Sequence, residues 1–173
     1  VAFAMAYFAV QTRKQELIEK RVEELERLMF REKLSTSEKE LSGIIYERGV
    51  DTAGFARIRS KGDKALFGGN TTLDMKKMLQ IPNSRALADF LPAITIKAKD
   101  LANEITNFTL KRDTHVRGEK PIVDEHIKNN KNMREFLGKS GIKPEVLPPE
   151  EDIKKVGRRL KKEDKKLLGK KKI

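Results

Sequence analysis

The sequence predicts a mainly α-helical protein of several helices, and three observations support that prediction. The first 34 residues contain no proline or glycine and carry apolar side chains at helical spacing. Charged residues make up 37% of the 173-residue chain, which favours long solvated helices over one thick globule. Glycine and proline then recur at positions that bracket further helical segments. We therefore expect a multi-helix domain that follows one long N-terminal helix.

Residues 1–34 are expected to form that long amphipathic helix, of about nine turns. Its apolar seam has a 4-3-4 spacing at Ile18, Val22, Leu25 and Met29. Gln11 and Gln15 interrupt the seam, so packing within the chain and pairing in a homodimer through this first helix both remain open. Glu23 and Arg27, four residues apart, are expected to pair on the helix surface.

Residues 35–142 are expected to form a helical domain, which opens with two short elements. Ser35 and Glu38 have the spacing of a capping box, which predicts a separate helix from about residue 36 to residue 48. The periodicity changes between residues 55 and 67, around the turn-forming tripeptide at 61–63. This change favours a small β-hairpin, with a further helix as the alternative.

A helix-turn-helix outline follows the glycine-rich loop at 68–70. Thr71 or Thr72 can cap a helix that runs to Leu79, and a second short helix is expected at 84–91. Arg85 would then lie near the start of a recognition helix for duplex DNA. The hairpin would add a basic wing that contacts phosphates. Its basic residues are Arg57, Arg59, Lys61 and Lys64. Two ordinary short helices and a solvated charged turn are the alternatives.

Two longer helices and a linker complete the expected domain. Pro92 suits the start of a helix that ends near Arg112, and a second helix follows Pro121 and ends near Gly138. The segment 143–149 holds three prolines and is expected to be a stiff linker.

The last segment, 150–173, is the most basic part of the chain. It holds eleven basic and five acidic residues, which is half of the formal net charge of +12. Apolar residues at 153, 156, 160 and 167 could form an opposing strip, so we expect an amphipathic basic helix, with a disordered tail as the alternative. The basic pairs are Lys154, Lys155, Arg158, Arg159, Lys161, Lys162, Lys165 and Lys166. Such a stripe predicts contact with nucleic-acid phosphate or another polyanion.

The sequence has few residues of the types that form catalytic or metal sites. The chain has no cysteine, which agrees with the reducing cytoplasm. Its two histidines, His115 and His126, lie in polar surroundings without ligand or triad spacing, so we expect exposed helix residues, no catalysis, no metal site and no cofactor. The apolar opening of residues 1–10 lacks an initiator methionine and is too short to span a bilayer. We therefore expect further residues upstream and no membrane anchor.

Several segments resemble the DinD family of DNA-damage-inducible proteins. The resemblance lies in residues 7–17, 45–50, 54–63, 66–69, 87–92, 96–99 and 147–152. It implies a bacterial SOS-response protein with an N-terminal BRO-N domain, from which residues 1–34 would continue. It also implies a role in modulating RecA filaments on single-stranded DNA, without a known catalytic activity. The site residues named above rest on charge alone.

Three functional hypotheses therefore stand at the level of sequence. The first is a regulator that binds the RecA filament and single-stranded DNA through the basic C-terminal stripe. The second is an oligomerisation module that pairs through the first helix. The third is an antirepressor-like protein that reads duplex DNA through the helix-turn-helix and its wing.

Overall fold

The computed structural model describes residues 2–169, with side chains from Met5 to Lys166. Within this range the chain forms helices joined by loops and contains no strand. The mainly α-helical prediction is confirmed. The helices are α1 (Ala2–Glu47), α2 (Thr52–Leu66), α3 (Thr72–Met78), α4 (Ala93–Arg112), α5 (Glu119–Lys139) and α6 (Ile153–Gly169), with 3-10 turns η1 (Leu87–Phe90) and η2 (Pro144–Val146). In the described range, no helix combines the length and the apolar composition that a membrane crossing requires.

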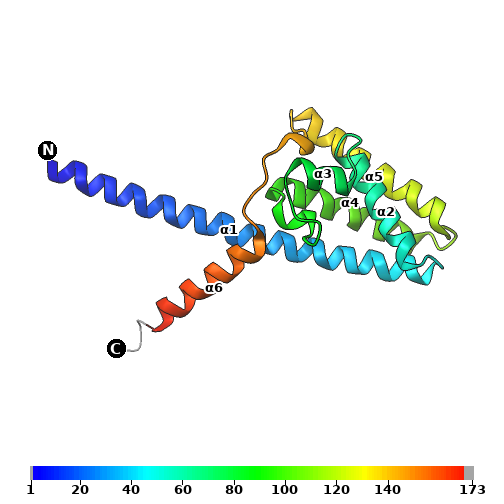
Figure 1. Cartoon of the computed structure of the whole chain (residues 1–173), viewed down its shortest axis with the longest axis horizontal. Helices are drawn as coiled ribbons and strands as arrows, with labels where there is room; N and C mark the ends of the chain where they lie inside the picture. Colours follow the sequence, from blue (N-terminus) through cyan, green and yellow to red (C-terminus); the bar gives the residue numbers. More distant parts are fainter. Residues whose placement is uncertain (1, 170–173) are drawn as a thin grey trace.

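The molecule has a body and two projecting helices. In the body, α4 packs along the C-terminal half of α1, and α5 packs on both α2 and α4. The N-terminal half of α1 extends away from the body (Figure 1). Helix α6 crosses α1 where it leaves the body and then diverges from it, so that both chain ends point to the same side (Figure 1). The body thus leaves one long face of α1 uncovered.

Helix α1 is continuous through Ser35, so the predicted helix boundary there is wrong. Ser35, which was expected to cap a new helix, lies inside α1, and the two hydroxyl groups that follow it are hydrogen-bonded. Thr36 donates to the backbone carbonyl of Glu32, and Ser37 donates to that of Leu34 and to the Asp100 carboxylate of α4. Leu34 and Leu41 are both buried against the body, which holds the helix straight across the polar segment.

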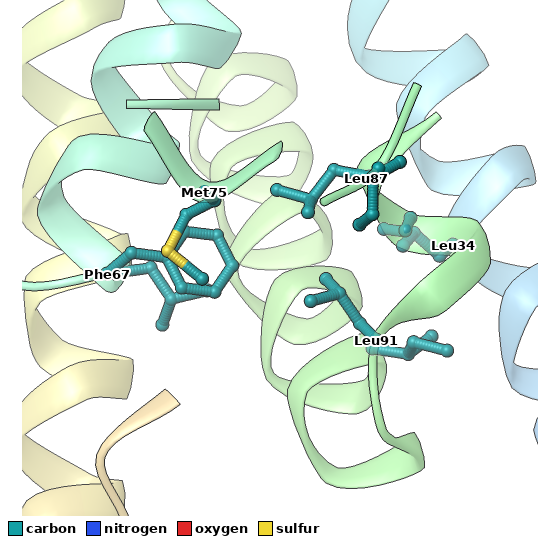
Figure 2. Close-up of a cluster of buried hydrophobic side chains, with 9 residues drawn as sticks. Leu34, Phe67, Met75, Leu87 and Leu91 are labelled. Atoms are coloured by element: carbon teal, nitrogen blue, oxygen red, sulfur yellow. The ribbon is translucent and has the colours of Figure 1, made fainter. Parts of the chain in front are cut away.

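Two apolar clusters form the core. The first lies between α1, the end of α2, α3 and η1, where Phe67 and Met75 face Leu34, Leu87 and Leu91 (Figure 2). The second lies toward the far end of α1. Its buried members are Leu41, Ile44, Ile45, Val50, Ile58, Leu110, Ile122 and Val123. Together the clusters fix the C-terminal half of α1 along one side of the body, where α4 lies between α1 and α5.

The β-hairpin expected at 55–67 is wrong, because these residues form most of α2. Asp51 caps this helix by accepting a hydrogen bond from the backbone N–H of Gly54 at 2.7 Å. Gly54, Ile58, Gly62 and Leu66 are buried at a spacing of four, which is a helical face. Gly62 allows close helix contact rather than a turn, since a Cβ there would lie 2.4 Å from Nε2 of His126 on α5.

The helix-turn-helix outline is also wrong, although its first helix is correct. Thr71 and Asp74 form the capping box of α3. The second segment forms only the short turn η1. Leu91 is extended before Pro92, as proline requires of the preceding residue, so no recognition helix is present at 84–91.

The remaining helices agree with the sequence. Helix α4 starts after Pro92 and ends at Arg112, and α5 ends at Lys139. The predicted linker contains η2, where Pro144 is buried, and then returns to the body through a hydrogen bond from the Glu150 backbone N–H to the Phe90 carbonyl. The linker is therefore attached at both ends before α6 begins.

Gly62 provides a test of the α2–α5 contact. Gly62→Ala should destabilise the fold by about 1–3 kcal/mol, because the new methyl group overlaps the buried His126 ring. Gly43→Ala is the matched control, since a Cβ there meets no atom within 4 Å and alanine should stabilise α1 by about 0.5–1 kcal/mol. Urea unfolding measures both. Equal effects at the two positions would contradict the close contact.

Candidate functional site

The basic segment forms helix α6, which lies on α1 through an apolar strip. Ile153, Val156 and Leu160 are each 2–3% exposed, so the predicted strip is confirmed for these residues. Leu167 lies outside the residues whose side chains are described. Gly157 faces Leu28 of α1, because a Cβ added at Gly157 would lie 3.4 Å from the Leu28 side chain. The strip fixes which side of α6 faces α1 and leaves the opposite side exposed.

Arg27 anchors the start of α6, and its predicted surface pairing with Glu23 is wrong. Its side chain is 4% exposed and donates to the backbone carbonyls of Asp89, Leu91 and Glu151 at 2.8–3.1 Å. Burial lowers the pKa of Arg27, and the carboxylates of Glu150, Glu151, Asp152 and Asp89 oppose that shift. Arg27 lies seven residues before Leu34 and fourteen before Leu41, so its position on the apolar face that α1 buries was the sequence signal for such an anchor.

Two further ion-pair groups fix α6 along α1. Arg159 binds Glu24 at 2.8 Å and Glu151 at 2.7 Å. Arg21 binds Glu163 at 2.8 Å and also Asp164. On α6, these ion pairs involve Arg159 and the two acidic residues of its described part, Glu163 and Asp164. Arg159, one of the predicted contact residues, is therefore occupied within the chain.

The other seven predicted basic residues of α6 are exposed. Among the described residues, none of the seven has an acidic partner within ion-pair distance. They form two rows at helical spacing, both away from the buried strip. Lys154, Arg158 and Lys161 line a groove between α6 and α1 and, with Lys165, form the groove-side row, whereas the outer row, which does not line this groove, is Lys155, Lys162 and Lys166. The structure thus presents a rigid, unneutralised basic surface of the kind that binds polyanions.

Three predicted residues outside α6 hold the fold together. Arg57 binds Glu119 of α5 at 2.6 Å, which raises the pKa of Arg57 and lowers that of Glu119. Arg59 binds Glu38 of α1 at 2.8 Å. Arg85 binds Asp152 at 2.6 Å and the buried Asp89 at 3.1 Å, so it connects η1 to the start of α6. Arg57 and Arg59 therefore do not form the predicted basic wing, and Arg85 does not lie on a recognition helix.

Lys61 and Lys64 are exposed on α2, where the hairpin was expected. They lie on the body and not beside α6, so the predicted set of contact residues separates into two places (Figure 1). Of that set, the exposed rows of α6 form the larger continuous surface.

Sequence reasoning missed a buried polar cluster between α2, α4 and α5. The Lys99 ammonium bonds the Asp63 carboxylate, and both residues are buried. His126 is 4% exposed, so its predicted exposure is wrong, and it contacts the Thr106 hydroxyl through Nδ1 at 3.2 Å. Burial, aided by the Lys99 charge, lowers the pKa of His126 to about 4. The sequence signal for this cluster is the spacing of the polar residues at 99, 103 and 106, which places them on one buried face of α4.

This cluster is closed to any sizeable ligand. The cavity beside Asp63, Lys99 and His126 measures about 10 Å³, which is the space of one water molecule. His115, the other histidine, is exposed at the α4–α5 connection. The geometry of the cluster therefore supports a packing role.

Comparison with known proteins identifies the family. Residues 21–156 match the model of the DinD C-terminal domain. The chain belongs to the DinD C-terminal domain family. It is also similar to DNA damage-inducible protein D of Escherichia coli K12, with 29% identity over 177 aligned residues. That alignment covers 96% of this chain and 63% of the relative, so this DinD family member spans less than two thirds of the relative's length.

His126 predicts a pH dependence of stability. Its folded pKa of about 4 lies below the ordinary value of about 6.5, so the unfolded chain binds the extra proton between these values. Stability should therefore fall as the pH drops, by about 1 kcal/mol between pH 7 and pH 5.5 from this group. His126→Gln should flatten that part of the profile in urea unfolding, and the exposed control His115→Gln should not. An unchanged slope in His126→Gln would contradict the burial of a neutral imidazole.

Proposed function

We propose that this chain is a non-catalytic DNA-binding part of a DNA-damage-response protein that modulates RecA filaments. The relationship to DNA damage-inducible protein D supports the damage-response role. The resemblance to the DinD family supports the RecA filament as the target. Single-stranded DNA and the filament both lie in the cytoplasm, where we propose that the protein acts.

The observation that carries the proposal is the exposed basic surface of α6. Seven basic side chains lie on a helix that is fixed to α1 by an apolar strip and ion pairs. Because the backbone of α6 is already held on α1, binding a phosphate backbone does not require this helix to become ordered, and it releases counterions. Such contacts position a protein without reading sequence. We therefore propose phosphate as the group that α6 recognises.

Sequence-specific binding to duplex DNA has less support. The proposed recognition helix does not form, and Arg85, its base-reading residue, is bound to Asp89 and Asp152. Duplex binding through phosphate alone is still compatible with α6, so duplex and single-stranded DNA should be compared directly.

The outer row of α6 provides the test. The triple variant Lys155→Ala, Lys162→Ala, Lys166→Ala should bind single-stranded DNA more weakly than the unmodified chain. A plot of the logarithm of the binding constant against the logarithm of the salt concentration should have a slope shallower by about 2. Each lost phosphate contact contributes about 0.7 to that slope on a single strand. Fluorescence anisotropy across a salt series measures both quantities, with free DNA and with DNA in a RecA filament.

The control is an equal change of charge on the body. Lys120→Ala, Lys131→Ala, Lys139→Ala removes three exposed lysines from α5 and should retain the original salt slope. Substitutions are preferable to truncation after Pro149, because loss of α6 would expose Leu28 of α1 and leave Arg27 without Glu151. Equal losses in the two triple variants would show that only net charge matters and would overturn the assignment to α6.

A further inference from the structure

The uncovered face of α1 carries an apolar stripe that the described body does not use. Ile18, Val22, Leu25 and Met29 are 57%, 49%, 42% and 56% exposed, and Phe8 continues the stripe at 67%. The body packs on the other side of α1, through Leu34, Leu41 and Ile45. An exposed apolar stripe of this kind marks an interaction surface.

The spacing of the stripe is that of a coiled-coil seam. Its positions recur at alternating intervals of three and four residues over three heptads. They are Phe8, Gln11, Gln15, Ile18, Val22, Leu25 and Met29. We propose that a second copy of this chain occupies the stripe, and that the two α1 helices form a parallel two-stranded coiled coil. Gln11 and Gln15 reduce the stability of such a pair, but polar seam residues restrict its register.

The charges beside the seam select the parallel orientation. Lys14 and Arg21 occupy the flank just before the seam positions 15 and 22, and Glu19 and Glu26 occupy the flank just after positions 18 and 25. In a parallel pair, each flank faces the opposite flank of the other helix, so Lys14 meets Glu19 of the second copy, while Arg21, which already binds Glu163 and Asp164 of its own chain, lies near Glu26. In an antiparallel pair, like flanks meet, and glutamate would face glutamate. The sequence therefore favours one orientation.

Helix α6 adds a second complementary surface. It lies on the flank of α1 that carries Arg21 and Leu28, and it forms with α1 a groove of about 780 Å³. Leu25, Leu28 and Met29 line the groove on one side, and Lys154, Arg158 and Lys161 on the other. The parallel second copy would bring its Glu19–Glu26 flank to this basic rim. The outer row of α6 points away from the groove, so the proposal does not depend on DNA binding.

Sedimentation or light scattering without DNA tests the dimer. The unmodified chain should show about twice its mass of 19.8 kDa at micromolar concentration, and Ile18→Asp should be a monomer. Leu17→Asp is the matched control, because Leu17 is 54% exposed on the same helix but lies off the seam, and it should remain a dimer. Circular dichroism should show both variants folded, since neither position is buried. A monomeric unmodified chain, or equal effects of the two substitutions, would overturn the proposal.

Charge reversal tests the orientation. Lys14→Glu and Glu19→Lys should each raise the dimer dissociation constant severalfold, because each creates like-charged pairs across a parallel seam. Mixing the two variants should favour the heterodimer, in which both pairs are again opposite. Lys20→Glu, an equal change on the outer face of α1, should have little effect. A tighter homodimer of Glu19→Lys would indicate antiparallel helices and overturn the parallel arrangement.

Discussion

The arrangement of the molecule depends on the buried guanidinium of Arg27. It joins three parts of the chain that are distant in sequence: α1, the η1 segment and the start of α6. Three backbone carbonyls accept its hydrogen bonds, and nearby carboxylates offset the cost of burying its charge. Carbonyl oxygens at fixed positions need a donor of fixed geometry, which the planar guanidinium provides and a lysine ammonium does not. Helix α6 can therefore carry many like charges without separating from α1.

Within the body, polar groups determine how the helices pack. The Asp63–Lys99 pair and the neutral His126 ring occupy positions where α2, α4 and α5 meet. A buried ion pair adds little net stability, but leaving one partner alone is costly, so it disfavours helix registers that would separate the two charges. Gly62 adds a steric restriction, because His126 occupies the space of its missing side chain. The apolar clusters supply most of the driving force, and this polar layer specifies one arrangement.

Helical periodicity predicted the long elements, because α1, α4 and α5 bury one face each and α6 has a clear apolar strip. The errors arose where tertiary contacts outweighed local preference. Ser35 and Glu38 have the spacing of a cap, but the continuous burial of Leu34 and Leu41 keeps α1 intact. The tripeptide at 61–63 has turn-forming residues, but Gly62 and Asp63 serve a helix contact and a buried ion pair. The basic surface of α6 was predictable as a charge stripe. The acidic residues Glu119, Glu38 and Asp152, which bind Arg57, Arg59 and Arg85, are distant in sequence, so only the fold defines these pairs.

The proposed dimer and the proposed DNA contact would reinforce each other. A two-fold axis along a parallel α1 pair places the two α6 helices on opposite sides of the coiled coil at the same level. Each outer row would then face solvent independently, so one dimer could contact two stretches of phosphate backbone. The second contact would be intramolecular, and its effective concentration would depend on whether the polyanion can span the coiled coil. A filament that repeats along its axis offers such paired stretches, whereas a short free strand reaches one row at a time. Bivalency would thus favour the assembled filament over naked DNA without any residue that reads sequence.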